Sequence, residues 1–177
     1  MKKISIVIPV FNSSKILHEL NNQINDAISS FEYDLILVND CSTDNSWEII
    51  QEICTKNKFA FGINLRMNSG QDNAIMAGLN FSKGEFVVIM DDDLQHSPYD
   101  IELLVNKCSE GFDICYGNYK IKKQKMWKNL GSWFNGKVAE FLINKPKNIY
   151  LSPYKVIKSE IVKEIIKYKG PYPYVQG

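Results

Sequence analysis

Three consecutive aspartates, Asp91, Asp92 and Asp93, follow directly on an apolar run at 86–90. The run is rich in β-branched residues and predicts a strand buried on both faces. Adjacent carboxylates repel one another, so holding them together is costly without a cation or several hydrogen-bond donors. On extended chain Asp91 and Asp93 would point to one side and Asp92 away from it. Oxygen ligands of this kind suit Mg²⁺ or Mn²⁺, typically shared with the phosphates of a substrate.

Two other interpretations of the aspartate triplet need to be weighed. A solvated acidic turn is the simplest one, and it stays open at this point. A calcium-binding EF-hand loop is the second, because oxygen-bearing side chains fall at its ligand positions one, three, five and twelve: Asp91, Asp93, Gln95 and Glu102. However, position six must be glycine for a sharp turn, and His96 stands there. A strand rather than a helix also precedes the triplet, so we reject the calcium loop.

The composition is that of a small globular protein without a strong charge bias. The chain has 177 residues, 45% of them hydrophobic, which predicts one compact domain with a substantial core. The formal net charge of +1 gives no global reason to expect nucleic-acid binding. One local basic run stands out, and it is either a solvated loop or a site for an anion. Its members are Lys120, Lys122, Lys123, Lys125 and Lys128.

The cysteines and the apolar runs indicate a soluble chain from a reducing compartment. The four cysteines show no Cys-x-x-Cys spacing, so we expect buried thiols rather than disulfides or zinc ligands. The first apolar run is too short for a signal peptide, and no stretch approaches the roughly 20 apolar residues of a membrane span. We therefore expect this chain itself to be soluble and cytoplasmic in character.

Strand and helix patterns alternate along the first two thirds of the chain. Repeated strand–helix units imply an α/β fold with a mostly parallel sheet and right-handed crossovers. Ser13 or Ser14 is expected to cap the first helix, and small residues such as Gly78 allow the third helix to pack closely on the sheet. We expect strands at 4–10, 33–38, 59–65, 86–90 and 112–116, and helices over 17–31, 45–56, 74–79 and 98–105.

Carboxylates follow two of the expected strands, at the point where each strand ends. Asp40 comes after the second strand and the aspartate triplet after the fourth. In an open α/β sheet, ligands bind outside the carboxyl ends of the strands, so these groups are expected to border a binding site. No Gly-x-Gly-x-x-Gly follows the first strand and no Walker loop is present, which removes the motifs for dinucleotide and P-loop binding. Sugar-nucleotide binding remains open.

The pattern changes in the last third of the chain. Residues 126–143 predict a helix with one apolar stripe, flanked by lysines and Trp133. The stripe fits a core-packing helix and equally an amphipathic helix at a bilayer surface. Residues 149–156 suggest a returning strand and 159–168 a short helix. The run at 170–177 suggests that the protein continues, and we expect membrane-associated helices to follow.

Four short motifs in a fixed order resemble the inverting family 2 glycosyltransferases, which have a GT-A fold. They are IPVFN at 8–12, VNDCSTD at 38–44, NLRMNSGQ at 64–71 with AGL at 77–79, and MDDDLQ at 90–95. The last motif, together with the NxGQ pattern, looks most like the branch that glycosylates polyprenyl phosphates, such as dolichol-phosphate-mannose synthases and bactoprenol glucosyltransferases. The resemblance implies a single α/β domain with a Rossmann-like, mostly parallel sheet flanked by helices.

The resemblance also implies how a nucleotide-sugar donor is held. Pro9 and Phe11 would form the pocket for the nucleotide base, and Asp40 would hydrogen-bond the base. Further nucleotide-sugar contacts are expected from residues of the same motifs: Asn12, Asn68, Gly70, Gln71, Asp91 and Asp92.

Catalysis is expected to rest on the aspartate motif. By the resemblance, Asp93 would bind the Mg²⁺ or Mn²⁺ that bridges the donor diphosphate, with Asp91 as a second ligand that also helps to hold the donor. Gln95 would lie beside the donor sugar. A divalent ion at this place neutralises the charge that develops on a departing nucleoside diphosphate. His96 is expected to be a supporting or turn residue rather than a base.

The acceptor side departs from the pattern of these relatives. Many relatives have Gly-Asp-Phe-Arg where this chain has Ser-Pro-Tyr-Lys at 152–155, so a carboxylate is missing. A hydroxyl acceptor needs a positioned carboxylate or histidine to take its proton. A lipid phosphate has a second pKa near ~6, so it is already a nucleophile at neutral pH and needs cations instead. The candidates are Lys120, Lys122, Lys123, Lys125 and Lys155.

The leading hypothesis is therefore an inverting, metal-dependent transfer of a sugar from a UDP or GDP conjugate to undecaprenyl phosphate or a similar lipid. The nearest alternative is transfer to a sugar hydroxyl in capsule, O-antigen or another surface polysaccharide. A non-catalytic sugar-nucleotide-binding module is the alternative from another class.

The same hypothesis predicts how the domain is organised and which partners it binds. Residues 1–117 would form the nucleotide-sugar-binding core and 118–177 the acceptor-side part of the same domain. The expected partners are the nucleotide-sugar donor, a polyprenyl phosphate or glycan acceptor, and the cytoplasmic membrane surface in the full-length protein. Nucleic acid is not expected as a partner, and homo-oligomer formation is left open.

Overall fold

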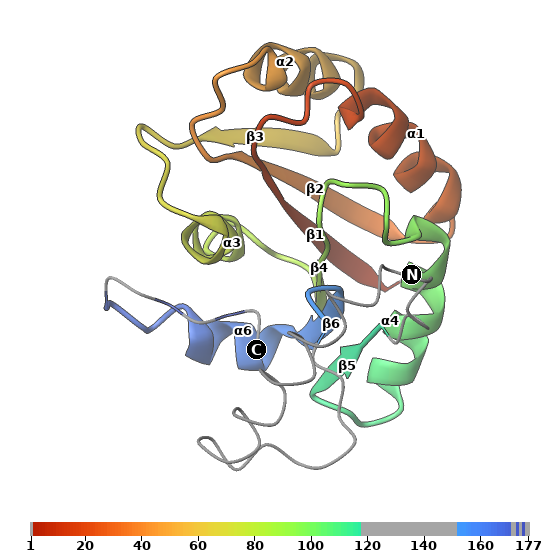
Figure 1. The fold of residues 1–177 in the computed structure, drawn as a ribbon. Coiled ribbons are helices and arrows are strands. Elements are labelled where there is room, and N and C mark those ends of the chain that lie inside the picture. Colours follow the sequence, from red (N-terminus) through yellow and green to blue (C-terminus); the bar gives the residue numbers. More distant parts are fainter. Residues whose placement is uncertain (1, 118–151, 171–172, 174, 176–177) are drawn as a thin grey trace, which may run out of the picture.

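A six-stranded sheet forms the centre of the described part of the molecule (Figure 1). The computed structural model describes residues 2–117, 152–170, 173 and 175. The strands lie in the order β3-β2-β1-β4-β6-β5. Their bounds are β1 Lys3–Val10, β2 Glu32–Asn39, β3 Ala60–Asn64, β4 Phe86–Ile89, β5 Ile114–Tyr116 and β6 Lys155–Lys158.

The four strands β3, β2, β1 and β4 are parallel to one another, as the alternation of strands and helices predicts. β6 then pairs antiparallel with both β4 and β5, so it separates two strands that run in the same direction. The predicted α/β fold with a mostly parallel sheet is therefore confirmed. The antiparallel strand near one edge is a feature that mixed α/β sheets commonly carry.

Helices cover both faces of the sheet (Figure 1). One face carries α1, α2 and α4, and the other carries α3 and α6, because the apolar residues of these helices fall into two separate core clusters. A short 3₁₀ turn, η1 Pro98–Asp100, leads into α4. The helix bounds are α1 Leu17–Ala27, α2 Ser46–Lys56, α3 Gln71–Leu79, α4 Ile101–Ser109 and α6 Ser159–Ile165.

The central strands are apolar on both sides because both faces of the sheet are covered. In β1, Ile4, Ile6 and Ile8 belong to the core on the α1 side, whereas Val7 belongs to the core on the α3 side. All of these side chains are fully buried. Burying one aliphatic side chain of this size contributes about 1.5–3 kcal/mol. The continuous apolar runs thus hold the strand ends, and the polar residues that follow them, in a fixed frame.

Gly78 permits the close approach of α3 to the sheet, as its place among small residues predicts. A Cβ atom on Gly78 would lie 2.4 Å from Cγ1 of Val7 and 3.1 Å from Cγ2 of Val38. Any larger residue would push α3 away from β1 and β2. Because α3 begins at Gln71 beside the strand ends, this contact also sets the position of the helix N-terminus.

The start of the first helix differs from the prediction. α1 begins at Leu17, and neither Ser13 nor Ser14 caps it. Instead, the backbone N–H of Ser13 donates to Oγ of Ser46 at 2.9 Å, and that of Ser14 donates to Oδ2 of Asp44 at 3.1 Å. The serines therefore join the loop after β1 to the loop after β2, a contact that only the sheet brings about.

The last third of the chain agrees with the prediction in part. The returning strand expected at 149–156 forms at Lys155–Lys158, and the helix expected at 159–168 covers Ser159–Ile165. The helix predicted at 126–143 and the run Lys120, Lys122, Lys123, Lys125 and Lys128 lie outside the described residues.

Two further expectations concern the cysteines and the membrane. The four cysteines are free thiols, as predicted, but only Cys108 is fully buried. Within the described ranges, no helix has both the length and the apolar character needed to span a bilayer.

Candidate functional site

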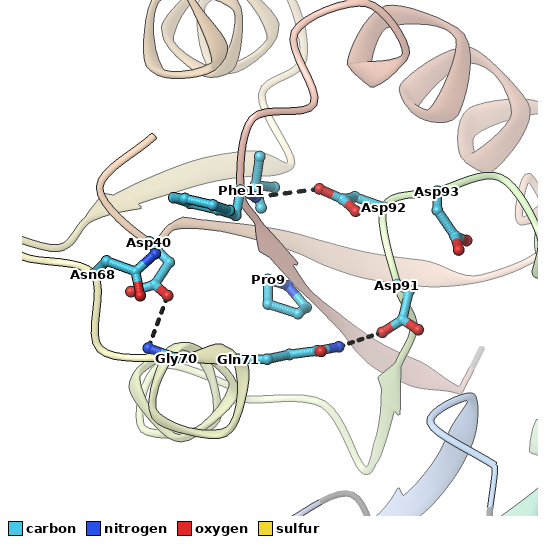
Figure 2. Close-up of a pocket in the computed structure, with 10 residues that line it drawn as sticks. Pro9, Phe11, Asp40, Asn68, Gly70, Gln71, Asp91, Asp92 and Asp93 are labelled. Carbon is cyan, nitrogen blue, oxygen red and sulfur yellow. Dashed lines mark hydrogen bonds between the residues drawn. The ribbon is translucent and has the colours of Figure 1, made fainter. Parts of the chain in front are cut away.

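A pocket of about 430 Å³ lies at the carboxyl ends of β1, β2 and β4 (Figure 2). The strand order reverses here, because the chain passes from β1 outward to β2 and β3 and then returns to the other side of β1 as β4. Such a switch point is where open α/β sheets bind ligands. The lining residues are Pro9, Val10, Phe11, Asp40, Asn68, Gly70, Gln71, Asp91, Asp92 and Asp93.

The pocket brings together most residues that the sequence singled out for the donor. Asn12 and Gln95 are the predicted residues that do not line it. Val10 lines the pocket but was not predicted, because an apolar residue inside a strand carries no chemical signal of its own. Its position between Pro9 and Phe11 in the first motif was the only available indication.

Asp40 is almost entirely buried, at 4% exposure, and both of its carboxylate oxygens accept backbone hydrogen bonds. Oδ1 accepts the N–H of Ser69 at 2.7 Å, and Oδ2 accepts that of Gly70 at 2.9 Å. Gly70 has φ of +86°, a conformation that favours glycine. Asp40 therefore holds the loop before α3 against the end of β2, and this loop forms one wall of the pocket.

Asn12 fastens the loop after β1 to the loop after β2 rather than facing the pocket. Its backbone N–H donates to Oγ of Ser42 at 3.0 Å, and its Oδ1 accepts the N–H of Thr43 at 2.8 Å. Its φ of 55° lies in the left-handed region, which asparagine tolerates better than most residues. These bonds hold Asn12 between the two loops, and its contact with the donor stays a prediction.

Asp44 completes the connection between these two loops. Its Oδ1 accepts hydrogen bonds from the N–H and Oγ of Ser46, at 3.0 and 2.5 Å, and its Oδ2 accepts the N–H of Ser14. Burial alone would raise the pKa of Asp44, but the hydrogen bonds from Ser46 and Ser14 outweigh it and lower the pKa to about 2. The carboxylate is therefore charged over the whole physiological pH range.

Asp91 is tied to the first residue of α3. Nε2 of Gln71 donates to Oδ1 of Asp91 at 2.6 Å (Figure 2). Burial raises the pKa of Asp91, and the charges of Asp93 and Asp92 raise it further, against opposing contributions from His96 and Gln71. A carboxylate that is costly to keep charged in this way favours a nearby cation.

Asp92 contacts the opposite wall of the pocket. Its Oδ2 accepts the backbone N–H of Phe11 at 3.3 Å, and Figure 2 shows its carboxylate turned towards that residue. Burial raises the pKa of Asp92, although bonds from Ser13 and Phe11 partly oppose the effect. Phe11 itself is 48% exposed, so its ring is available to a planar ligand.

Asp93 is exposed, and its Oδ1 accepts the N–H of Gln95 at 3.0 Å, a hydrogen bond within its own loop. The strand ends at Ile89, and the chain bends from Asp92 onward, with Leu94 at φ of 59°. The bend, rather than the alternation of an extended strand, therefore sets the directions of the three carboxylates. Gln95 is exposed and lies outside the pocket lining.

The donor set of the pocket fits a divalent cation that shares its coordination with a ligand. Among the described residues, no group of three His, Cys, Asp or Glu side chains converges as a metal cage. Mg²⁺ usually binds through one or two carboxylates together with substrate phosphates, which is the number that Asp91 and Asp93 can offer. The raised pKa of Asp91 and the exposure of Asp93 agree with such a site.

His96 supports the loop after the aspartates, as expected for a turn residue. It is 9% exposed, and its ring stacks on Tyr154 with 5.2 Å between ring centroids. The hydroxyl of Tyr154 donates to the carbonyl of Ser97 at 3.1 Å. These contacts join the aspartate loop to the segment that leads into β6.

Lys155, one of the cations predicted to hold an acceptor phosphate, is buried in β6 at 2% exposure. Its Nζ donates to the carbonyl oxygen of Val175. Its contact with an acceptor phosphate stays a prediction. Burial lowers the pKa of Lys155 to about 8, although the charges of Asp72 and Asp91 oppose the shift.

Comparison with protein-family models matches residues 5–166 to "Glycosyl transferase family 2". Among solved structures, S. aureus TarS residues 1–349 in complex with UDP shares 22% identity at a TM-score of 0.64, over 96% of this chain and 50% of that one. Glucosyl-3-phosphoglycerate synthase from Mycobacterium tuberculosis, in complex with Mn²⁺, UDP-glucose and phosphoglyceric acid, shares 18% identity at a TM-score of 0.70, over 90% and 57%. The chain spans about half the length of these proteins, and at this identity they show a common fold.

Proposed function

The chain belongs to glycosyl transferase family 2, and we propose that it forms the donor-binding part of an inverting enzyme that transfers a sugar from a nucleoside diphosphate to a polyprenyl phosphate. One observation carries the proposal. Three aspartates at the end of β4 border the same pocket as an exposed phenylalanine at the end of β1. A nucleoside diphosphate needs this combination of an aromatic surface for its base and, through a metal, carboxylates for its phosphates.

The base of the donor would bind between Pro9, Phe11 and the loop at 68–70. Phe11 offers a half-exposed ring for stacking, and Asp40 keeps the opposite loop in place through Ser69 and Gly70. The structures of TarS with UDP and of the mycobacterial synthase with UDP-glucose support a uridine nucleotide as the first candidate. A guanosine nucleotide is the second candidate.

The phosphates would lie at the aspartates. We assign Asp93 and Asp91 as the residues that hold Mg²⁺ or Mn²⁺, an assignment that the Mn²⁺ complex of the mycobacterial synthase supports. The bound cation would stabilise the negative charge that develops on the departing nucleoside diphosphate. Gln71 orients Asp91 through its hydrogen bond, and Asp92 keeps the aspartate loop next to Phe11. Gln95 would approach the donor sugar.

The acceptor would enter from the part of the domain formed by 118–177, with 1–117 serving the donor. A lipid phosphate is our preferred acceptor because it needs no general base, and no carboxylate stands in the Ser-Pro-Tyr-Lys segment at 152–155. Lys120, Lys122, Lys123 and Lys125 are the cations that we assign to this phosphate. A lipid acceptor also implies that the full-length enzyme works at the cytoplasmic membrane surface.

Calorimetry with a panel of nucleoside diphosphates, with and without Mn²⁺, tests the donor site. We expect one nucleotide to bind in a Mn²⁺-dependent way, and Asp93→Ala to weaken that binding at least 100-fold. Glu102→Ala, which removes an exposed carboxylate of α4, is the matched control and should bind like the wild type. If a folded wild type binds none of the nucleotides, the donor site is wrongly assigned.

The acceptor is tested with the sugar conjugate of the nucleotide that binds. Transfer of labelled sugar to undecaprenyl phosphate in detergent is expected, with phosphate-free undecaprenol as the matched control. Transfer to an oligosaccharide hydroxyl, with none to the lipid phosphate, would instead establish the surface-polysaccharide alternative. Binding of the donor without turnover on either acceptor would favour a non-catalytic module.

A further inference from the structure

A lysine lies fully buried in the sheet, on the strand next to the one that leads to the aspartates. Lys155 opens β6, where it pairs with Ile89 of β4 on one side and with Tyr116 of β5 on the other. It is 2% exposed. A buried ammonium group is costly unless other groups compensate its charge, so its presence needs a physical reason.

Neutral groups provide the direct contacts of this ammonium group. Its Nζ donates to the carbonyl oxygen of Val175 and lies 5.5 Å from the centroid of the Tyr116 ring. Within the described residues, no carboxylate lies close enough to Nζ to form an ion pair with it. The positive charge is therefore available to act over a longer distance through the low-dielectric interior.

Lys155 is linked to two carboxylates, one of the donor pocket and one at its border. β6 pairs Lys155 with Ile89, two residues before Asp91, and the charges of Asp72 and Asp91 oppose the lowering of the Lys155 pKa by burial. Asp72 stands in the first turn of α3, and its Oδ1 accepts the backbone N–H of Val175 at 3.2 Å. The neighbouring Gln71 donates to Asp91. Lys155 and Asp72 thus hold the two polar backbone groups of Val175, which fixes the ammonium group on the α3 side of the sheet.

We propose that Lys155 is a positioning residue of the donor site, a fixed counter-charge that offsets the carboxylates of Asp91 and Asp72 so that the pocket accepts an anionic nucleotide. The role rests on the proposed function and goes beyond it, because it assigns Lys155 to the donor rather than to the acceptor. It also explains why a lysine is kept where an apolar residue would pack at lower cost.

The proposal predicts opposite effects on two ligands. Without the positive charge, the pocket is more negative by one unit. A divalent cation alone should then bind more tightly, and a nucleoside diphosphate without metal should bind more weakly. For charges several ångströms apart at a partly buried site, each change should be about three- to tenfold. A variant that only loosened the fold would weaken both ligands.

The experiment measures binding of Mn²⁺ alone, and of UDP and GDP without metal, by calorimetry at pH 7. The variants are Lys155→Met and Lys155→Gln, with Lys158→Met as the matched control on the same strand. The glutamine variant removes the charge but keeps a donor for the Val175 carbonyl. Both Lys155 variants are expected to bind Mn²⁺ more tightly and the nucleotide more weakly, whereas Lys158→Met should match the wild type.

Three outcomes overturn the proposal. Unchanged binding in both Lys155 variants would refute the counter-charge role alone. Wild-type behaviour of Lys155→Gln beside a changed Lys155→Met would show that the hydrogen bond to Val175 matters, and not the charge. A wild type that binds no nucleotide, with or without Mn²⁺, would refute the proposed function and this role together. If Lys155→Met does not fold, Lys155→Gln decides between the first outcome and the expected one.

Discussion

Two groups of carboxylates lie in the loops around the pocket, and they differ in what they bond to. In the loop after β2, Asp40 accepts hydrogen bonds from two backbone N–H groups, and Asp44 accepts two from backbone N–H groups and one from a serine hydroxyl. Among the described residues, the aspartates after β4 have fewer hydrogen-bond partners, and the partner of Asp93 lies in its own loop. The first group is used to build the pocket wall, whereas the second has oxygen atoms left for a ligand.

The directions of the pKa shifts follow the same division. Hydrogen bonds lower the pKa of Asp44 to about 2, whereas burial raises the pKa values of Asp91 and Asp92. A carboxylate whose charged form is stabilised by hydrogen bonds contributes to the stability of the fold. A carboxylate whose charged form is destabilised by burial is stabilised when a cation binds to it. Residue type alone does not distinguish the two kinds of aspartate, but their bonding does.

The sharpest test of this comparison is the effect of removing one carboxylate from each group on stability. We expect Asp40→Ala to lower the free energy of unfolding by about 3 kcal/mol, because the N–H groups of Ser69 and Gly70 lose the buried, charged acceptor that they share. Asp93→Ala should change it by less than about 0.5 kcal/mol. Urea unfolding followed by circular dichroism measures both values. Equal losses of unfolding free energy in the two variants would show that the two groups of aspartates do not differ in their contribution to stability.

A smaller effect, on nucleotide binding, is expected from a change at Gln71. Gln71→Ala removes the hydrogen bond to Asp91 at the N-terminus of α3 but leaves the pocket wall intact. Loss of a hydrogen bond to a partly exposed charged group should weaken Mn²⁺-dependent nucleotide binding about five- to tenfold. Calorimetry measures this loss, and Gln71→Glu serves as the contrast because it adds a negative charge there. Loss of more than about 2 kcal/mol of stability would instead place Gln71 with the wall residues.

The smallest expected effect is on the pH dependence of stability. The pKa of Asp44 falls from 3.8 to about 2 on folding, so its carboxylate stabilises the fold above pH 4 and loses that effect as the pH falls towards 2. Because the group is near the surface, we expect about 1 kcal/mol. Asp44→Asn should flatten this part of the profile in urea unfolding between pH 5 and 2. A profile as steep as that of the wild type would show that other groups cause the acid loss.

Most of the fold could be predicted from the sequence because each strand is an apolar run buried on both faces. The runs at β1, β2 and β4 allow only a sheet covered by helices on both sides, which the two core clusters confirm. The position of β6 in the sheet could not be predicted. Nothing in the local pattern of Lys155–Lys158 shows that this strand lies between β4 and β5, since strand order depends on contacts distant in sequence.

The location of the candidate site could be predicted for a related reason. Parallel strands end at the same edge of a sheet, so polar residues after separate strands had to meet. The partners of each side chain could not be predicted. Asn12 and Asp40 both looked like ligand-binding residues, yet their oxygens bond to loops brought together by tertiary packing. The burial of Lys155 depends likewise on Val175, 20 residues further along the chain.

The place of β6 in the sheet also determines the order in which the fold can be completed during synthesis. β6 is the last of the described strands to leave the ribosome, but it pairs with β5 and with the side of β4 that faces away from β1. Until residues 155–158 emerge, the nascent chain presents β4 as an open edge, which is the kind of edge that recruits other strands. Docking of β6 joins segments far apart in sequence and is therefore expected to be a late, slow step. A chaperone that shields β4 would act in this interval.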